Sequence, residues 1–174
     1  MELGREGFKE EVMGEVWEND TIKTVSESRT EQGYMIRARY LNSVGRLFGG
    51  DLLAWIDETG AFAAKRHCNR EVTTVAIDNI HFAKAMFEGD IAVLIAKVTY
   101  VGNTSMEVRV HTYVEELDGR RTLVNSAYLV YVAIDEDKPI RVPRLKVCTQ
   151  EQKDEWIAGE KRALMRKQRR KEGY

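Results

Sequence analysis

The sequence predicts an α+β domain in which an antiparallel β-sheet wraps around one long central α-helix. Residues 51–68 contain no proline and no run of β-branched residues, and apolar side chains cover most sides of the helix they would form. A helix that is apolar on most sides is usually buried on most sides. Four segments rich in Val, Ile, Tyr and Thr follow it, and their connections are too short for the crossovers that parallel strands need.

The first 50 residues are less regular. Residues 1–20 are mostly charged with scattered apolar side chains, which predicts either a short amphipathic helix or a loose arm. Strand character appears at Thr21–Val25 and, with alternating side chains, at Tyr34–Tyr40. Three glycines then fall within residues 45–50, so the backbone there must turn tightly or admit a close neighbour.

The four later segments are expected to form a meander of neighbouring antiparallel strands. Short turn signals separate them, among them Asp118-Gly119, which is a strong hairpin signal. Pro139 and Pro143 are expected to end the sheet, and residues 150–171 are expected to form a polar, basic helix. The strands are expected at Val72–Phe82, Asp90–Val101, Ser105–Glu115 and Thr122–Ile134.

Two of these strands, Ile91–Val101 and Leu123–Ile134, are apolar on both faces. The central helix can cover only one face of the sheet. We therefore expect the other face to pack on a second subunit, which predicts an oligomer.

The formal net charge of −1 conceals an uneven distribution. Residues 1–20 carry seven acidic and two basic side chains, whereas residues 160–174 carry seven basic and two acidic ones. The length of 174 residues fits one domain, which we divide into an acidic arm (1–20), the sheet-and-helix domain (21–148) and a basic helix and tail (149–174). The tail is a candidate anion-binding element.

Composition excludes several classes of protein. Two cysteines exclude a disulfide-dense scaffold and a four-cysteine zinc site, and the three histidines show no metal-ligand spacing. No apolar run reaches the roughly 18 residues of a membrane helix, and the N-terminus lacks a secretory signal. We therefore expect a cytoplasmic protein with no membrane partner. The basic tail has one aromatic residue, Tyr174, so nucleic-acid binding is a disfavoured alternative.

Asp57 is the first candidate for chemistry, because it lies two turns into the most apolar helix of the chain. A buried carboxylate is costly unless it is paired or used. Asp57 is therefore either a general base or a structural group that caps or salt-bridges a neighbouring element. The residue pattern alone leaves both readings open.

The second candidates are the Gly49-Gly50 pair and Asn42. The glycines precede a helix whose first N–H groups are free, and these groups with the helix dipole suit an anion or a polarised carbonyl. Asn42 can donate to a carbonyl or hold a water, although a plain turn also explains both features. About 10 Å of helix rise separates Gly50 from Asp57. A site that uses both therefore needs two copies of the chain, packed with their helices antiparallel.

Several ordered motifs together carry a resemblance to a known family. The stretch NSVGRLFGGDLLAWID runs from Asn42 to Asp57, and it is followed by AAKRHC at 63–68, IDNIHF at 77–82, VGNTSMEV at 101–108, VAID at 132–135 and RALMRKQRR at 162–170. In these motifs the chain resembles the hotdog-fold acyl-CoA thioesterases, in particular the bacterial acyl-CoA hydrolases related to the brain acyl-CoA hydrolase. The resemblance extends from about residue 21 to residue 170.

The resemblance implies a hotdog fold that assembles as a homodimer and commonly as a hexameric trimer of dimers. It implies hydrolysis of acyl-CoA to a free acid and coenzyme A, with no metal and no cofactor apart from the CoA of substrate and product. It places the catalytic carboxylate on Asp57 and the catalytic amide on Asn42, and our mechanistic hypothesis adds the Gly50 N–H as the group that polarises the carbonyl. The implied CoA contacts are Thr74, Val75, Ala76, Asn103, Thr104, Ser105 and Arg162. The main alternative is a non-catalytic hotdog protein that binds CoA or acyl groups without releasing a thiol.

Overall fold

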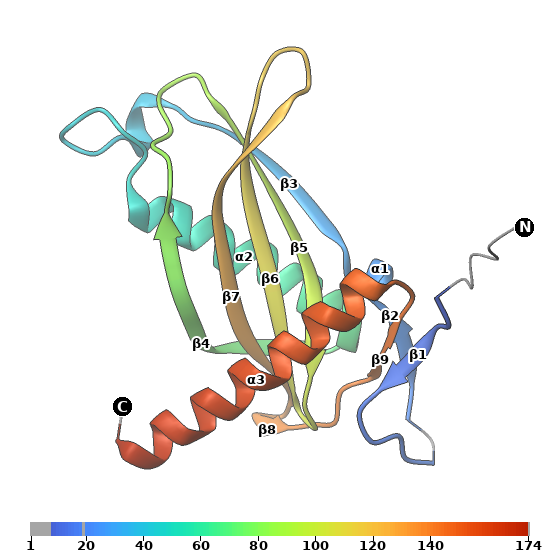
Figure 1. Ribbon diagram of the computed structural model, residues 1–174. Coiled ribbons are helices and arrows are strands. Elements are labelled where there is room, and N and C mark those ends of the chain that lie inside the picture. Colours follow the sequence, from blue (N-terminus) through green and yellow to red (C-terminus); the bar gives the residue numbers. More distant parts are fainter. Residues whose placement is uncertain (1–7, 19, 174) are drawn as a thin grey trace, which may run out of the picture.

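The fold has three layers, and the computed structural model describes residues 8–18 and 20–173 of the chain. The helix α2 (Gly49–Cys68) lies in the curve of a six-stranded sheet, and the helix α3 (Gln150–Glu172) crosses the opposite face of that sheet (Figure 1). The predicted α+β architecture, with a sheet around a central helix, is therefore confirmed.

The main sheet is antiparallel throughout, with the strand order β3-β5-β6-β7-β4 and with β8 paired to β7. The four predicted long strands are all present, and β3 and β4 form the edges of this order. The strands are β3 (Thr30–Met35), β4 (Glu71–Phe82), β5 (Ile91–Val101), β6 (Ser105–Glu115), β7 (Arg121–Asp135) and β8 (Lys138–Pro139).

A second, three-stranded sheet has the order β1-β9-β2. Its strands are β1 (Glu11–Met13), β2 (Ile22–Thr24) and β9 (Arg144–Val147), and β2 runs parallel to β9. The main sheet ends with β8, as expected from Pro139 and Pro143, but β9 begins directly after Pro143 as part of this second sheet. Thr21–Val25 is only partly strand, since the short helix α1 (Val25–Ser28) begins at its last residue.

The strand predicted at Tyr34–Tyr40 is displaced toward the N-terminus. The strand β3 ends at Met35, and Ala38–Tyr40 form the 3-10 helix η1. Ile36 leaves the ladder because its N–H donates to Asp90 O and its carbonyl accepts from Gly89 N–H, both at 2.9 Å. The chain is thus anchored to the turn before β5 instead of to a neighbouring strand.

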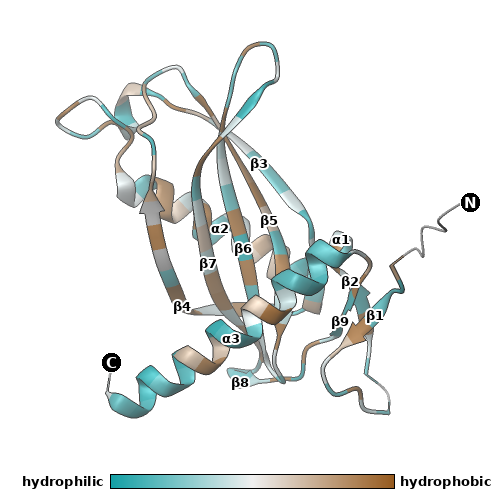
Figure 2. Cartoon of the chain, viewed as in Figure 1, coloured by the Kyte–Doolittle hydropathy of each residue, from teal (hydrophilic) through white to brown (hydrophobic). Residues whose placement is uncertain are grey.

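The hydrophobic core lies between α2 and the concave face of the sheet. Figure 2 shows apolar residues along β5, β6 and β7, whereas α3 is largely hydrophilic. The core side chains are almost fully buried, among them Leu52, Ile56, Ala63, Val98, Val108, Val110 and Leu129. At the C-terminal end of α2 the Lys23 ammonium donates to Arg66 O (2.6 Å), which complements the negative end of the helix dipole.

The helix α3 covers the outer face of the sheet, where we had expected a second subunit. Trp156 is buried and its ring lies 5.2 Å from that of Tyr100. The fully buried Glu107 carboxylate on β6 accepts from Arg162 (2.8 Å) and Arg166 (2.9 Å). The expectation of another subunit on this part of the face is wrong, because these ion pairs let a polar helix of the same chain pack there.

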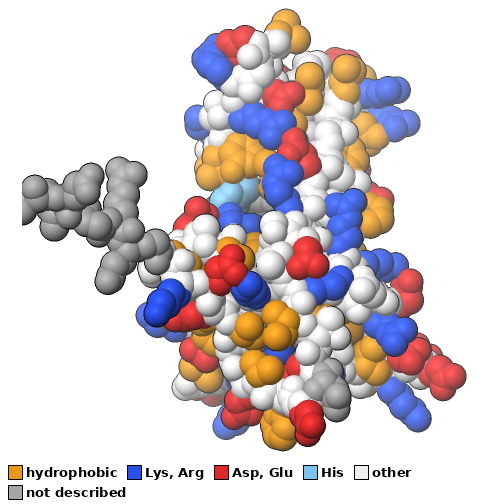
Figure 3. All heavy atoms as spheres, turned by 90° about the vertical axis from the view of Figure 1, so that its right-hand side faces the viewer, with side chains coloured by type: hydrophobic (Ala, Val, Ile, Leu, Met, Phe, Trp, Pro, Cys, Tyr) orange, Lys and Arg blue, Asp and Glu red, His pale blue; other side chains and the backbone are white. Residues whose placement is uncertain are grey.

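The described part of the acidic arm is tied to the chain by ion pairs. Glu11 pairs with Lys153 of α3 (2.8 Å), and Asp20 pairs with Arg141 (3.0 Å). Acidic and basic side chains are intermixed on the face that carries the arm (Figure 3). Residues 1–7 and 19 of the predicted arm lie outside the described residues. None of the described helices is long and apolar enough to cross a membrane.

Candidate active site

Asp57 lies in the middle of α2 and is held from the sheet by two hydroxyl groups. Its Oδ1 accepts from Thr74 Oγ1 (2.8 Å) and from the Tyr131 hydroxyl (3.1 Å). Thr74 on β4 and Tyr131 on β7 are direct cross-strand partners, so the register of these strands brings both donors beneath one carboxylate. In the part of the chain that the structure describes, Oδ2 forms no hydrogen bond, which leaves that oxygen for a substrate or a water.

Asp57 is half-buried rather than fully buried as we expected from the sequence. The reason is that α2 is covered on one side only. Ala54 is exposed, and Phe62 is exposed to 41%. Asp57 therefore lies at the boundary between the buried side of α2 and the open side on which Ala54 and Phe62 are exposed.

Tyr131 is the donor whose role the sequence reasoning missed. Its side chain is fully buried, and burial together with the neighbouring Asp57 carboxylate raises the pKa of its phenol. The hydroxyl is therefore protonated at neutral pH and acts as a donor. A tyrosine between apolar residues of a strand resembles ordinary core filling, so only the cross-strand register could have revealed it.

The N-terminus of α2 presents free backbone amides, as predicted. The first helical hydrogen bonds run from Asp51 N–H and Leu52 N–H to Phe48 O (3.1 and 3.2 Å). The amides of Gly49 and Gly50 donate to no acceptor within the described residues. A side chain at Gly50 would overlap the Phe48 ring, so glycine is needed for this close approach.

Asn42 lies in the loop just before this helix. Its Oδ1 accepts from Val44 N–H (3.0 Å) and Arg46 N–H (3.1 Å), which is the turn-capping role that the sequence left open. These bonds also fix the plane of the side-chain amide. Its Nδ2 forms no hydrogen bond to the described residues, so it can still donate to a ligand.

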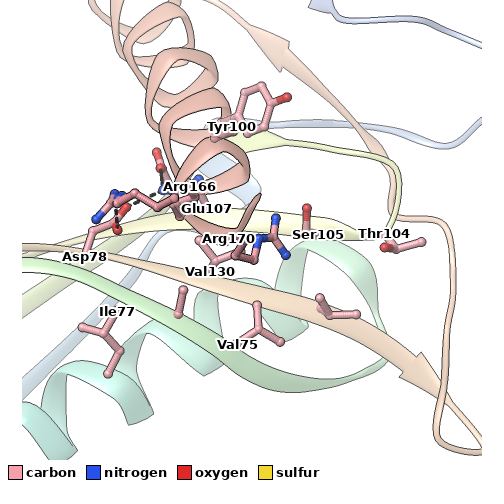
Figure 4. Close-up of a pocket in the computed structure, with 14 residues that line it drawn as sticks. Val75, Ile77, Asp78, Tyr100, Thr104, Ser105, Glu107, Val130, Arg166 and Arg170 are labelled. Carbon is pink, nitrogen blue, oxygen red and sulfur yellow. Dashed lines mark hydrogen bonds and ion pairs between the residues drawn. The ribbon is translucent and has the colours of Figure 1, made fainter. Parts of the chain in front are cut away.

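A cleft of about 640 Å³ opens between β4, the turn before β6 and the distal half of α3 (Figure 4). Four of the predicted CoA residues line it, namely Val75, Ala76, Thr104 and Ser105. Thr74 and Asn103 are not among the lining residues, and the Thr74 hydroxyl donates a hydrogen bond to Asp57.

The cationic side chains of the cleft come from α3. Arg166 forms ion pairs with Asp78 and Glu107, and Arg169 Nη2 lies 3.5 Å from Asp78 Oδ1. Arg170 lines the cleft and forms no ion pair with any described residue. The sequence analysis did not single out these three arginines, and predicted only that the basic tail as a whole binds an anion. Arg162, the basic residue named individually, pairs with Glu107 and lies 3.8 Å over the Tyr128 ring, so its contact with CoA stays a prediction.

His67 and Cys68 lie in the last turn of α2, away from Asp57 in the middle of that helix. His67 is buried with Nε2 paired to Pro143 O (3.0 Å), and burial lowers its pKa to about 4. Burial raises the pKa of the Cys68 thiol. Within residues 8–18 and 20–173, no three His, Cys, Asp or Glu side chains are placed to hold a metal ion.

Comparisons with known proteins identify the family. Residues 44–119 match the thioesterase superfamily. An acyl-CoA thioester hydrolase of Bacillus subtilis, itself uncharacterised, is 40% identical over 113 residues, which are 64% of this chain and 66% of that protein.

Two solved structures extend the match to most of the chain. An acyl-CoA hydrolase from Staphylococcus aureus in complex with butyryl-CoA, CoA and CoA disulfide is 33% identical, with a TM-score of 0.82 over 87% of this chain and 93% of that one. A hexameric acyl-CoA thioesterase is 38% identical, with a TM-score of 0.82 over 86% of this chain and 97% of that one. This chain therefore belongs to the thioesterase superfamily and, within it, to the acyl-CoA thioester hydrolases.

Proposed function

We propose that the chain hydrolyses acyl-CoA to a carboxylic acid and CoA, with Asp57 as the general base. The observation that carries the proposal is the geometry of Asp57, whose Oδ1 is fixed by two hydroxyl donors while Oδ2 stays open. A carboxylate held in this way has a defined orientation toward a bound water. The CoA complex of the related hydrolase supports the choice of substrate.

The proposed reaction begins with the thioester carbonyl at the N-terminus of α2. The Gly50 N–H polarises the carbonyl, and Asn42 Nδ2 orients either the carbonyl or the water. Asp57 takes a proton from the water as its oxygen attacks the carbonyl carbon. The tetrahedral intermediate then collapses, the C–S bond breaks, and CoA leaves as a thiolate that recovers the proton. Direct attack by the carboxylate is the alternative route.

The proposed site needs two copies of the chain. Gly50 and Asp57 lie on the same helix, about 10 Å apart along its axis, so one thioester cannot reach both within a single chain. The open side of α2 and the free edge of β4 expose large apolar side chains, as a buried interface would require. These are Phe48, Phe62, Ile77 and Phe82. We propose a homodimer with antiparallel α2 helices as the minimal unit, and a hexameric trimer of dimers as the assembly, as the hexameric relative supports.

We propose that the cleft beneath α3 holds the phosphates of CoA. The free Arg170 side chain supplies positive charge, and Thr104 and Ser105 supply hydroxyl groups on the opposite wall. Arginine binds phosphate through several donors at once, which suits this position. The cleft borders β4, and Thr74 of the same strand donates to Asp57.

Replacing Arg170 with Ala is expected to raise KM for acyl-CoA about 10-fold, because one charged contact with phosphate is lost. KM for an acyl thioester of N-acetylcysteamine, which has no phosphate, is expected to stay unchanged. Steady-state kinetics with both substrates measure the difference. Lys171→Ala is the matched control, because this neighbouring base does not line the cleft. Equal changes in KM for both substrates would show that Arg170 does not contact the phosphates.

The proposed function itself is tested by trapping the released thiol. Acyl-CoAs of increasing chain length are incubated with the protein, and the free thiol is titrated against time. Release of one thiol per acyl-CoA consumed is expected. Tight CoA binding without thiol release would instead establish the non-catalytic alternative.

A further inference from the structure

The Tyr131 hydroxyl makes two contacts with the same residue. Its single proton is shared between the main-chain carbonyl of Asp57 (2.8 Å) and Oδ1 of the Asp57 side chain (3.1 Å). The main-chain contact alone would satisfy the buried hydroxyl. The second contact joins the backbone and the carboxylate of one residue through a single donor, which restricts the rotamer of the Asp57 side chain.

Gly60 provides the space that this arrangement needs. It lies on the buried side of α2, and a Cβ added there would overlap the Tyr131 hydroxyl and lie 3.1 Å from Tyr131 Cζ. Glycine in the interior of a helix is less favourable than alanine. The helix thus keeps an unfavourable residue where its replacement would push the phenol away from Asp57.

The Thr74 and Tyr131 donors converge on one oxygen. Both reach Oδ1, and Oδ2 forms no hydrogen bond within the described residues. If either donor is lost, the carboxylate can rotate about its Cβ–Cγ bond, and the open oxygen loses its fixed direction. Thr74 is on the edge strand β4, which is open to a partner, whereas Tyr131 is on the interior strand β7 and is fully buried. Tyr131 is therefore the more rigid of the two supports.

We propose that Tyr131 is a positioning residue for the catalytic carboxylate. The absence of a side chain at Gly60 leaves the space in which the Tyr131 hydroxyl reaches Asp57. This inference rests on the proposed function of Asp57 as the base. Tyr131 does not touch the substrate. It selects which carboxylate oxygen faces the water and holds it there, so its loss affects the reaction step more than substrate binding.

The test is Tyr131→Phe, which removes the hydroxyl and keeps the ring. kcat for acyl-CoA is expected to fall about 10-fold, which corresponds to one hydrogen bond to a charged group. KM is expected to change by less than about twofold, because binding contacts remain. Tyr113→Phe is the matched control, since its hydroxyl contacts His111 and not Asp57. Thermal unfolding of each variant verifies that the fold is intact.

A double-mutant cycle separates positioning from general packing. Gly60→Ala is expected to lower kcat about as much as Tyr131→Phe does, and to add little once the hydroxyl is absent. Tyr131→Phe is likewise expected to change little in an Asp57→Asn background. Wild-type kcat for Tyr131→Phe, or equal losses with and without the Asp57 carboxylate, would overturn the positioning role while leaving the function of Asp57 intact. Near wild-type activity of Asp57→Asn alone would overturn both.

Discussion

Replacing Asp57 with Asn is expected to lower kcat for acyl-CoA hydrolysis about a thousandfold. The amide has nearly the shape of the carboxylate, and its oxygen can still accept from Thr74 and Tyr131. It cannot take a proton from water or attack a carbonyl carbon, and general base catalysis typically contributes a factor of about 100 to 10,000. The loss should appear in kcat, with KM for acyl-CoA nearly unchanged, in the thiol-release assay.

Glu58→Gln is the control for this variant. Glu58 is the next residue on α2, but it is exposed and accepts from the Tyr34 hydroxyl (3.1 Å), away from the pair of donors that holds Asp57. Its amide variant should hydrolyse acyl-CoA at nearly the wild-type rate. A near wild-type rate for Asp57→Asn, or a large loss for Glu58→Gln, would show that Asp57 is not the base.

The fold was largely predictable because its long elements carry strong local patterns. The apolar run of α2 and the β-branched segments of β4 to β7 predict the type of each element from the local sequence alone. Among the strands of the second sheet, only β2 was predicted, within the segment Thr21–Val25. The strands β1, β2 and β9 have three or four residues each, and they exist only because they pair with one another. The end of β3 depends in the same way on the contact between Ile36 and the turn at residues 87–90.

The outer face of the sheet shows a second limit of sequence reasoning. A polar helix such as α3 gives no apolar signal that it will cover a sheet. It packs there because Glu107, which lies in an otherwise apolar strand, pairs with Arg162 and Arg166. A separate ion pair, between Glu11 and Lys153, joins the acidic arm to the same helix.

The site residues likewise differ in whether the local sequence or the tertiary structure reveals them. Asp57 and Gly50 stood out because each breaks the local pattern, as a carboxylate in an apolar helix and as a glycine at a helix start. The family resemblance identified the enzyme class, and the comparisons confirm it. Tyr131 and Arg170 could not be found in this way, because their roles follow from strand register and from the path of α3. The roles of Asn42, Asp57 and Gly50 in the reaction stay predictions.

The second large effect that we expect is the return of hydrolysis activity when two inactive variants are mixed. Asn42→Asp keeps the Oδ1 acceptor that caps the loop through Val44 N–H and Arg46 N–H, and it removes the Nδ2 donor. We expect this variant and Asp57→Asn each to lose most of their activity. In a mixed dimer, one of the two sites combines the intact Asn42 of one chain with the intact Asp57 of the other.

The direct test of the shared site is therefore the hydrolysis rate after the two variants are unfolded together and refolded. Random pairing makes about half of the dimers mixed, and each has one intact site, so about a quarter of the wild-type rate should return. Each variant refolded alone should stay inactive. If the mixture is no more active than the two variants measured separately, each site lies within one chain and the shared-site account is wrong.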